Sequence, residues 1–151
     1  MIPRPRSTAK PTVFLAGLLY FALILSAGFA LGVVRELWLG PALGHTGAEL
    51  LEMPLMVAVC YVCAGKLRHL FPALGSSHWL VAGIFALVLM LAAEGLLAGV
   101  LRGLSLPEYL ATRHPAATFA YGLALALFAL LPWWLSRRDQ HSNTAVKRNK
   151  T

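Results

Sequence analysis

Charged residues are scarce in this sequence and absent from long stretches of it. Only 13% of the 151 residues are charged, whereas 58% are hydrophobic; an ordinary soluble domain carries about a quarter charged residues. Three runs of about 22–24 residues contain no charge: Thr12–Val34, Leu70–Ala93 and Pro115–Ser136. A helix of about 20 residues crosses the hydrocarbon core of a bilayer. The scarcity of charge therefore leaves no room for a separate soluble domain and predicts membrane-spanning helices.

The sequence also lacks the familiar patterns of catalysis and cofactor binding. It contains no H-E-x-x-H, no G-x-S-x-G and no Walker loop. All five histidines lie outside the apolar centres of the predicted spans, which argues against a haem held by facing helices. No segment alternates with period two over ten residues, as a membrane β-strand would. We therefore expect an all-α protein that is not an enzyme and holds no cofactor.

A fourth charge-free run, Met53–Gly65, is shorter than the others. It reaches spanning length only if Ala48–Glu52 is included, which places carboxylates at or inside the membrane edge. The first run is longer than the apolar region of a signal peptide, so we expect it to be retained. The predicted fold is thus a four-helix transmembrane bundle. Its spans are about 12–37, 48–67, 78–101 and 115–136, within a domain of 12–136 that lies between a basic segment, 1–11, and a basic tail, 137–151.

The distribution of Lys and Arg predicts the orientation of these spans. Ten of the thirteen cations lie at one set of span ends: Arg4, Arg6, Lys10, Lys66, Arg68, Arg137, Arg138, Lys147, Arg148 and Lys150. Only Arg35, Arg102 and Arg113 lie at the other ends. The positive-inside rule then puts both termini in the cytoplasm. The net charge of +7 follows from this topology and does not indicate nucleic-acid binding. We expect the tail to be disordered near anionic lipid.

Local signals mark several helix ends. Gly40-Pro41 predicts a stop for the first helix. Thr46 and Glu49 match a capping box at the start of the second helix. Ser105–Glu108 is another capping box and predicts a short interfacial helix in the outer loop. Trp79, at the inner start of the third span, is expected at headgroup level.

Two GxxxG patterns predict where helices pack. Gly28 and Gly32 lie in the first span, and Gly95 and Gly99 lie in the third. Both pairs begin about sixteen or seventeen residues into an outward-running span, so they sit at similar depth. Small residues at this spacing let two backbones approach closely. We expect spans one and three to cross there; a homodimer face is the competing use.

Glu94 is the least expected residue in the sequence. It interrupts an apolar run about two turns below the outer interface, where a lone carboxylate costs about 3 kcal/mol. Glu52 sits at similar depth in the second span, and Arg35 ends the first. We predict that these three residues form one polar cluster. Two acids and one base suit a proton-binding or cation-binding element; the alternative is a hydrogen-bonded pair that only fixes helix register.

The two cysteines continue a polar stripe on the second span. Glu49, Glu52, Met56, Cys60 and Cys63 follow one another at three or four residues and share one helix face. Soft sulfur ligands select metals such as Cu(I), so Met56, Cys60 and Cys63 are a minor candidate metal set. Mid-membrane thiols are unlike the exposed thiolates of redox sites, however. We expect them to pack as small apolar residues, with no metal bound.

The stretch from Gly28 to Met56, GFALGVVRELWLGPALGHTGAELLEMPLM, resembles small four-span proteins of the bacterial inner membrane whose function is unknown. The similar features are Gly28, Gly32, Arg35, Pro41, Gly44, Glu52 and Pro54. The resemblance covers roughly the first half of the chain. It implies four helices and a bacterial inner membrane, and it implies no activity.

Two classes of function remain open from the sequence. The first is a small carrier that binds a proton or cation through Glu52 and Glu94. The second is a non-catalytic accessory subunit that packs against another membrane protein. The expected partners are the lipid bilayer and either further copies of the chain or another membrane protein, with no nucleic acid.

Overall fold

The computed structural model describes residues 9–102 and 115–148, in which every regular element is a helix. The elements are α1 (Ala9–Val34), the π-helical turn η1 (Arg35–Leu39), α2 (Gly40–Leu70), α3 (Ser76–Arg102) and α5 (Pro115–Arg148). Three helical stretches are long and apolar enough to cross a membrane: Thr12–Leu70, Ser76–Leu97 and Thr118–Arg138. The all-α class and its compatibility with a membrane are confirmed. The interfacial helix predicted at Ser105–Glu108 lies outside the described residues.

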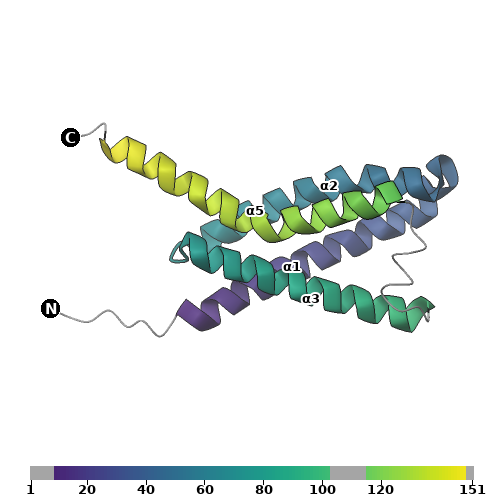
Figure 1. The fold of residues 1–151 in the computed structure, drawn as a ribbon, viewed down its shortest axis with the longest axis horizontal. Coiled ribbons are helices and arrows are strands. Elements are labelled where there is room, and N and C mark those ends of the chain that lie inside the picture. Colours follow the sequence, from purple (N-terminus) through teal and green to yellow (C-terminus); the bar gives the residue numbers. More distant parts are fainter. Residues whose placement is uncertain (1–8, 103–114, 149–151) are drawn as a thin grey trace.

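The first of these stretches folds back on itself. As one straight helix its 59 residues would extend about 88 Å, but α1 and α2 run side by side in opposite directions (Figure 1). The reversal occurs at Gly44, with φ 72° and ψ 161°, a conformation open almost only to glycine. The predicted helix stop at Gly40-Pro41 is wrong. Gly40 keeps helical dihedrals, and the helix continues through Pro41 into α2.

α5 is longer than predicted. It continues to Arg148, through most of the basic tail that the sequence predicts to be disordered. The tail holds neither glycine nor proline up to that residue, so nothing interrupts the helix. At the start of this extension Arg137 and Arg138 stack on Trp133 and Trp134, with 5.1 and 4.7 Å from guanidinium carbon to ring centroid. A guanidinium over an indole ring one helical turn away is stabilised by a cation–π interaction.

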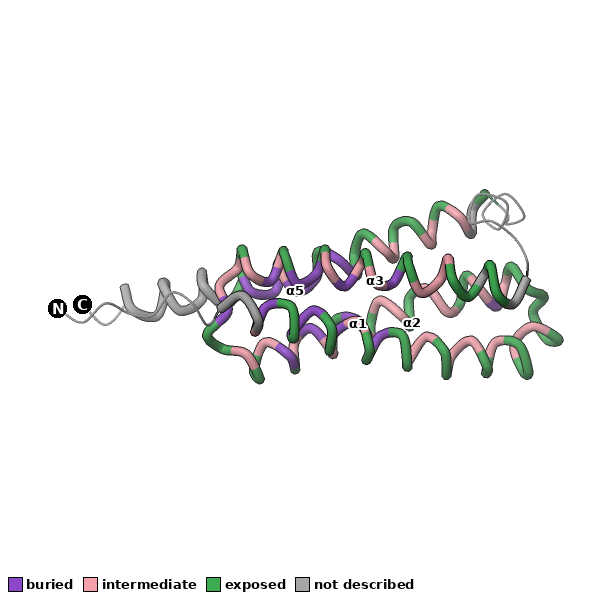
Figure 2. The backbone as a smooth tube through the Cα atoms, turned by 90° about the horizontal axis from the view of Figure 1, so that it is seen from below, coloured by how far each residue is buried: buried purple, intermediate pink, exposed green. Residues whose placement is uncertain are grey.

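The tight core occupies one half of the bundle. Buried positions gather in the half that contains the start of α1, whereas the half that contains the reversal at Gly44 is more open (Figure 2). Small residues allow this packing. A Cβ at Gly17 would lie 2.8 Å from the carbonyl oxygen of Ala82, where α1 meets α3, and one at Gly83 would collide with the Ala129 carbonyl of α5. Trp79 is only 2% exposed and packs in this core.

The predicted crossing of spans one and three at the GxxxG patterns is wrong. A Cβ at Gly32, Gly95 or Gly99 would meet no atom of the described chain within 4 Å. One at Gly28 would meet only the methyl of Met56, on α2, at an ordinary 3.5 Å. The depth of these glycines is similar, but depth does not determine which way a residue faces around its helix, and α1 instead approaches α3 at Gly17.

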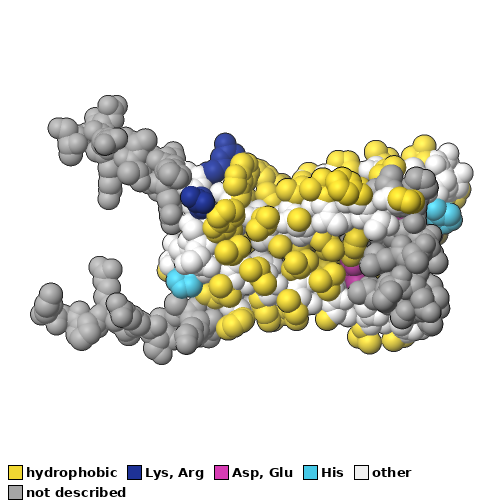
Figure 3. Space-filling model, viewed as in Figure 1, with side chains coloured by type: hydrophobic (Ala, Val, Ile, Leu, Met, Phe, Trp, Pro, Cys, Tyr) yellow, Lys and Arg dark blue, Asp and Glu magenta, His cyan; other side chains and the backbone are white. Residues whose placement is uncertain are grey.

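The outer surface is apolar along the length of the helices. Hydrophobic side chains cover the visible face, with Lys and Arg side chains at one end (Figure 3). The most exposed large side chains include Phe29, Val100 and Phe119. Such a surface would be a liability in water and is suited to lipid.

Candidate functional site

A cavity of about 590 Å³ lies in the more open half of the bundle. It is bounded by α1, η1, α2, α3 and α5. Its polar lining consists of one guanidinium, Arg35, and four carboxylates, together with the Tyr121 hydroxyl. The carboxylates are Glu36, Glu49, Glu52 and Glu94. The remaining lining is mainly aliphatic, aromatic and sulfur-containing. Four acids against one base give this cavity a lining that favours cations over anions.

Arg35 and Glu52 form an ion pair at the edge of the cavity. Nη1 of Arg35 donates to Oε2 of Glu52 at 2.8 Å, and the two side chains are only 24% and 11% exposed. Nη2 of Arg35 lies 3.4 Å from Oε1 of Glu36, which is half exposed. Arg35 is the first residue of the π-helical turn, a local widening that often occurs at functional sites. The structure thus brings together two of the three residues predicted to cluster, Glu52 from α2 and Arg35 from η1.

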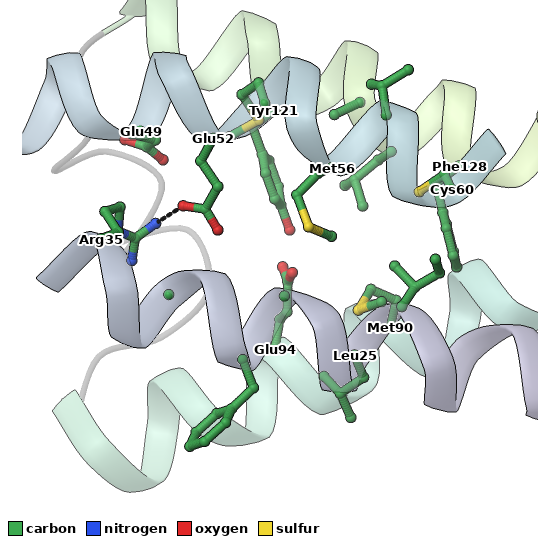
Figure 4. A pocket seen from close by; sticks show the side chains of 18 of the residues that line it. Leu25, Arg35, Glu49, Glu52, Met56, Cys60, Met90, Glu94, Tyr121 and Phe128 are labelled. Atoms are coloured by element: carbon green, nitrogen blue, oxygen red, sulfur yellow. Dashed lines mark hydrogen bonds and ion pairs between the residues drawn. The ribbon is translucent and has the colours of Figure 1, made fainter. Parts of the chain in front are cut away.

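Glu94 lines the same cavity from α3. It is half-buried, and its carboxylate points across the cavity toward the hydroxyl of Tyr121 on α5 (Figure 4). Arg35 and Glu52 lie to one side of Glu94, and Cys60 and Phe128 lie to the other. The three predicted residues therefore share one cavity, but the ion pair joins only Arg35 and Glu52.

The other end of the cavity is apolar and rich in sulfur. Met56 and Cys60 of α2, Met90 of α3 and Phe128 of α5 line it (Figure 4). Glu52 and Cys60 are eight residues apart on α2, so the polar and apolar ends are separated by about 12 Å along the helix. The cavity therefore has a charged end and an apolar end.

The cysteines take part in packing. Cys60 is 3% exposed and belongs to the core, and Cys63 packs against that core. Met56 and Cys60 line the cavity, whereas Cys63 does not. Within the part of the chain that the structure describes, no three His, Cys, Asp or Glu residues are grouped so that they could hold a metal ion.

Three lining residues were missed as site residues in the sequence. Glu49 was assigned to a helix cap and Glu36 to no role. Tyr121 was not singled out, although it is the only tyrosine in the charge-free run Pro115–Ser136. A hydroxyl inside such a run is a usable signal, because a buried tyrosine hydroxyl usually has a polar partner.

Compared with protein-family models, with curated proteins and with solved structures, the chain shows no match in any of the three. The assignment of function therefore depends on the cavity itself.

Proposed function

We propose that this chain is a multi-pass protein of the bacterial inner membrane that carries a proton or a cation through the cavity lined by Arg35, Glu52 and Glu94. In this proposal the bilayer is crossed four times and both termini are cytoplasmic. No catalytic step is part of the proposal. The observation that carries it is the placement of Glu94 in the same cavity as a preformed Arg35–Glu52 ion pair.

Several features support the topology. Each of α1 and α2 exceeds the roughly 20 residues that one crossing needs. The reversal at Gly44 would place them as two antiparallel crossings. The first described turn of α1 and the last of α5 lie toward one end of the molecule (Figure 1). Ten of the thirteen Lys and Arg residues belong to the span ends on that side.

The chemistry of the cavity assigns different roles to the two central acids. Arg35 compensates Glu52, so Glu52 acts as a fixed counter-ion. Glu94 faces a hydroxyl rather than a guanidinium, and it is the carboxylate that exchanges a proton for a cation. Intramembrane carboxylates that face a cavity commonly have this role. Tyr121 orients the carboxylate and donates to it when it is charged.

The test is transport by purified protein in lipid vesicles, with an imposed pH gradient and a set of monovalent cations. Wild-type protein should exchange cations for protons. Glu94→Gln, which keeps the size and hydrogen-bonding capacity of the side chain, should fold normally and lose the exchange. Equal exchange by wild type and Glu94→Gln would reject the proposal.

An accessory subunit is the second candidate function. The open space around Gly95 and Gly99 on α3 favours it, because small residues without close neighbours in the described chain suit a helix of another subunit. In that case Glu94 would only fix helix register. Activity of the assembly would then survive Glu94→Gln and fail with Glu94→Leu.

A further inference from the structure

From the two-ended lining of the cavity, we infer that its ligand is a monovalent organic cation with an apolar body, bound with its charge at Glu94 and its body at the Met56–Cys60 end. This inference rests on the proposed function and names the class of cation that the cavity takes.

The size of the cavity suits a small organic molecule better than a bare ion. About 590 Å³ is within the roughly 300–1,000 Å³ typical of small-molecule pockets. An inorganic cation needs several oxygen ligands at about 2.0–2.6 Å. Among the described residues no three acidic, histidine or cysteine side chains are grouped to hold a metal ion. The carboxylate in the middle of the cavity, Glu94, and the large volume fit one positive charge on a bulky molecule.

The charge pattern determines the sign of the ligand and its orientation. Arg35 already donates to the Glu52 carboxylate at 2.8 Å, so it is poorly placed to bind an anion. Glu94 lies between the charged and apolar ends, and the aromatic ring of Tyr121 faces the same space (Figure 4). A cation beside Glu94 would gain a counter-charge and would lie near the hydroxyl oxygen of Tyr121.

The apolar end suits ligands of varied shape. Met56 and Met90 are flexible, polarisable side chains that repack around different ligands. Phe128 adds an aromatic surface at the same end.

The test uses tetraphenylphosphonium and tetraphenylborate, which have nearly the same size and shape and opposite charges. Binding to the purified full chain is measured by equilibrium dialysis, with detergent alone as the blank. Wild type should bind the phosphonium saturably and the borate only as the blank does. Glu94→Gln should weaken phosphonium binding at least about tenfold, since a desolvated charge loses its partner. Asp139→Asn removes an acid of α5 that lies eighteen residues after Tyr121, about 27 Å along the helix, and should change nothing.

A second variant tests the volume without altering charge. Gly32 lines the cavity, and a Cβ there meets no atom of the described chain within 4 Å, so Gly32→Leu should fill space without a clash. It should weaken phosphonium binding, because the leucine side chain takes up volume that the apolar body of the ligand would fill. Gly122→Leu is the matched control, because Gly122 has similar open space and does not line the cavity.

The outcomes separate this inference from the proposed function. If both tetraphenyl ions bind alike, or if Glu94→Gln and Gly32→Leu bind the phosphonium as wild type does, the organic-cation inference is overturned. Loss of exchange of small cations in Glu94→Gln would then still support the proposed function with a smaller ligand. If small-cation exchange is also unaffected by Glu94→Gln, both proposals fail.

Discussion

The hydroxyl of Tyr20 on α1 donates a hydrogen bond of 3.0 Å to the carbonyl oxygen of Phe128 on α5. This carbonyl would normally accept from the N–H of the residue four positions on, which is Pro132 and has none. The two rings also stack, with centroids 4.8 Å apart and an interplanar angle of 9°. Tyr20 therefore donates to a carbonyl oxygen that lacks its usual N–H donor within α5. The bond connects α1 to α5 at the apolar end of the cavity.

Replacing Tyr20 by Phe should remove this hydrogen bond and keep the stacked ring. The free energy of unfolding should fall by about 1 kcal/mol, because the Phe128 carbonyl is left unsatisfied away from water. Tyr61→Phe is the control, since Tyr61 is about half exposed. Unfolding of both variants in mixed micelles measures the difference. A loss no larger than that of the control would mean that the bond contributes nothing to stability.

The Arg35–Glu52 pair should be coupled energetically. Arg35→Gln and Glu52→Gln should each lower the free energy of unfolding by about 1–3 kcal/mol, because each leaves a partly buried charge without its partner. The double variant should lose less than the sum of the two. Glu36→Gln, at a half-exposed carboxylate 3.4 Å from Arg35, should cost less than about 0.5 kcal/mol. If the loss in the double variant equals the sum of the losses in the two single variants, Arg35 and Glu52 are not coupled.

Gly44→Ala should destabilise the protein by about 1–3 kcal/mol. The cost is conformational, because φ 72° and ψ 161° are strained for any residue with a Cβ, while the added methyl meets no described atom within 4 Å. Gly47 lies in the helix that follows, and an added Cβ there would make only an ordinary 3.5 Å contact with Leu43. Gly47→Ala should therefore be neutral or stabilising. If the two variants unfold alike, the chain reverses elsewhere.

The double variant Cys60→Ala/Cys63→Ala should keep the fold with a modest loss of stability, because Cys60 fills space in the core. Metal analysis of purified wild type and double variant checks the alternative. Stoichiometric copper or zinc in wild type that disappears in the double variant would restore the metal set of Met56, Cys60 and Cys63.

The sequence predicts well those features that depend only on the residues within one helix, such as its apolar character and its length. Long charge-free runs predict apolar helices because the bilayer sets their length. The rarity of a carboxylate inside such a run was enough to single out Glu94 and Glu52. Arg35 was placed with them by depth alone, and the structure pairs it with Glu52.

The features that sequence misses depend on rotation about a helix axis and on long-range contacts. Gly28, Gly32, Gly95 and Gly99 were matched by depth, yet the close approach of α1 to α3 is at Gly17. Tyr121 faces Glu94 only because α5 packs against α2 and α3 in a particular register. The reversal at Gly44 rather than at Gly40-Pro41 shows that proline in a first helical turn does not end a helix.

The most direct measurement for the central claim is chemical labelling of Glu94 in the membrane. A hydrophobic carbodiimide such as dicyclohexylcarbodiimide reacts with protonated carboxyl groups that it can reach from lipid, and peptide mass analysis locates the product. The account predicts labelling at Glu94 that decreases as pH rises, since only the protonated form reacts, and that decreases when tetraphenylphosphonium or a transported cation is added. Labelling at Glu94 that no cation and no pH change alters, or its absence at every pH, would contradict a carboxylate that exchanges a proton for a cation.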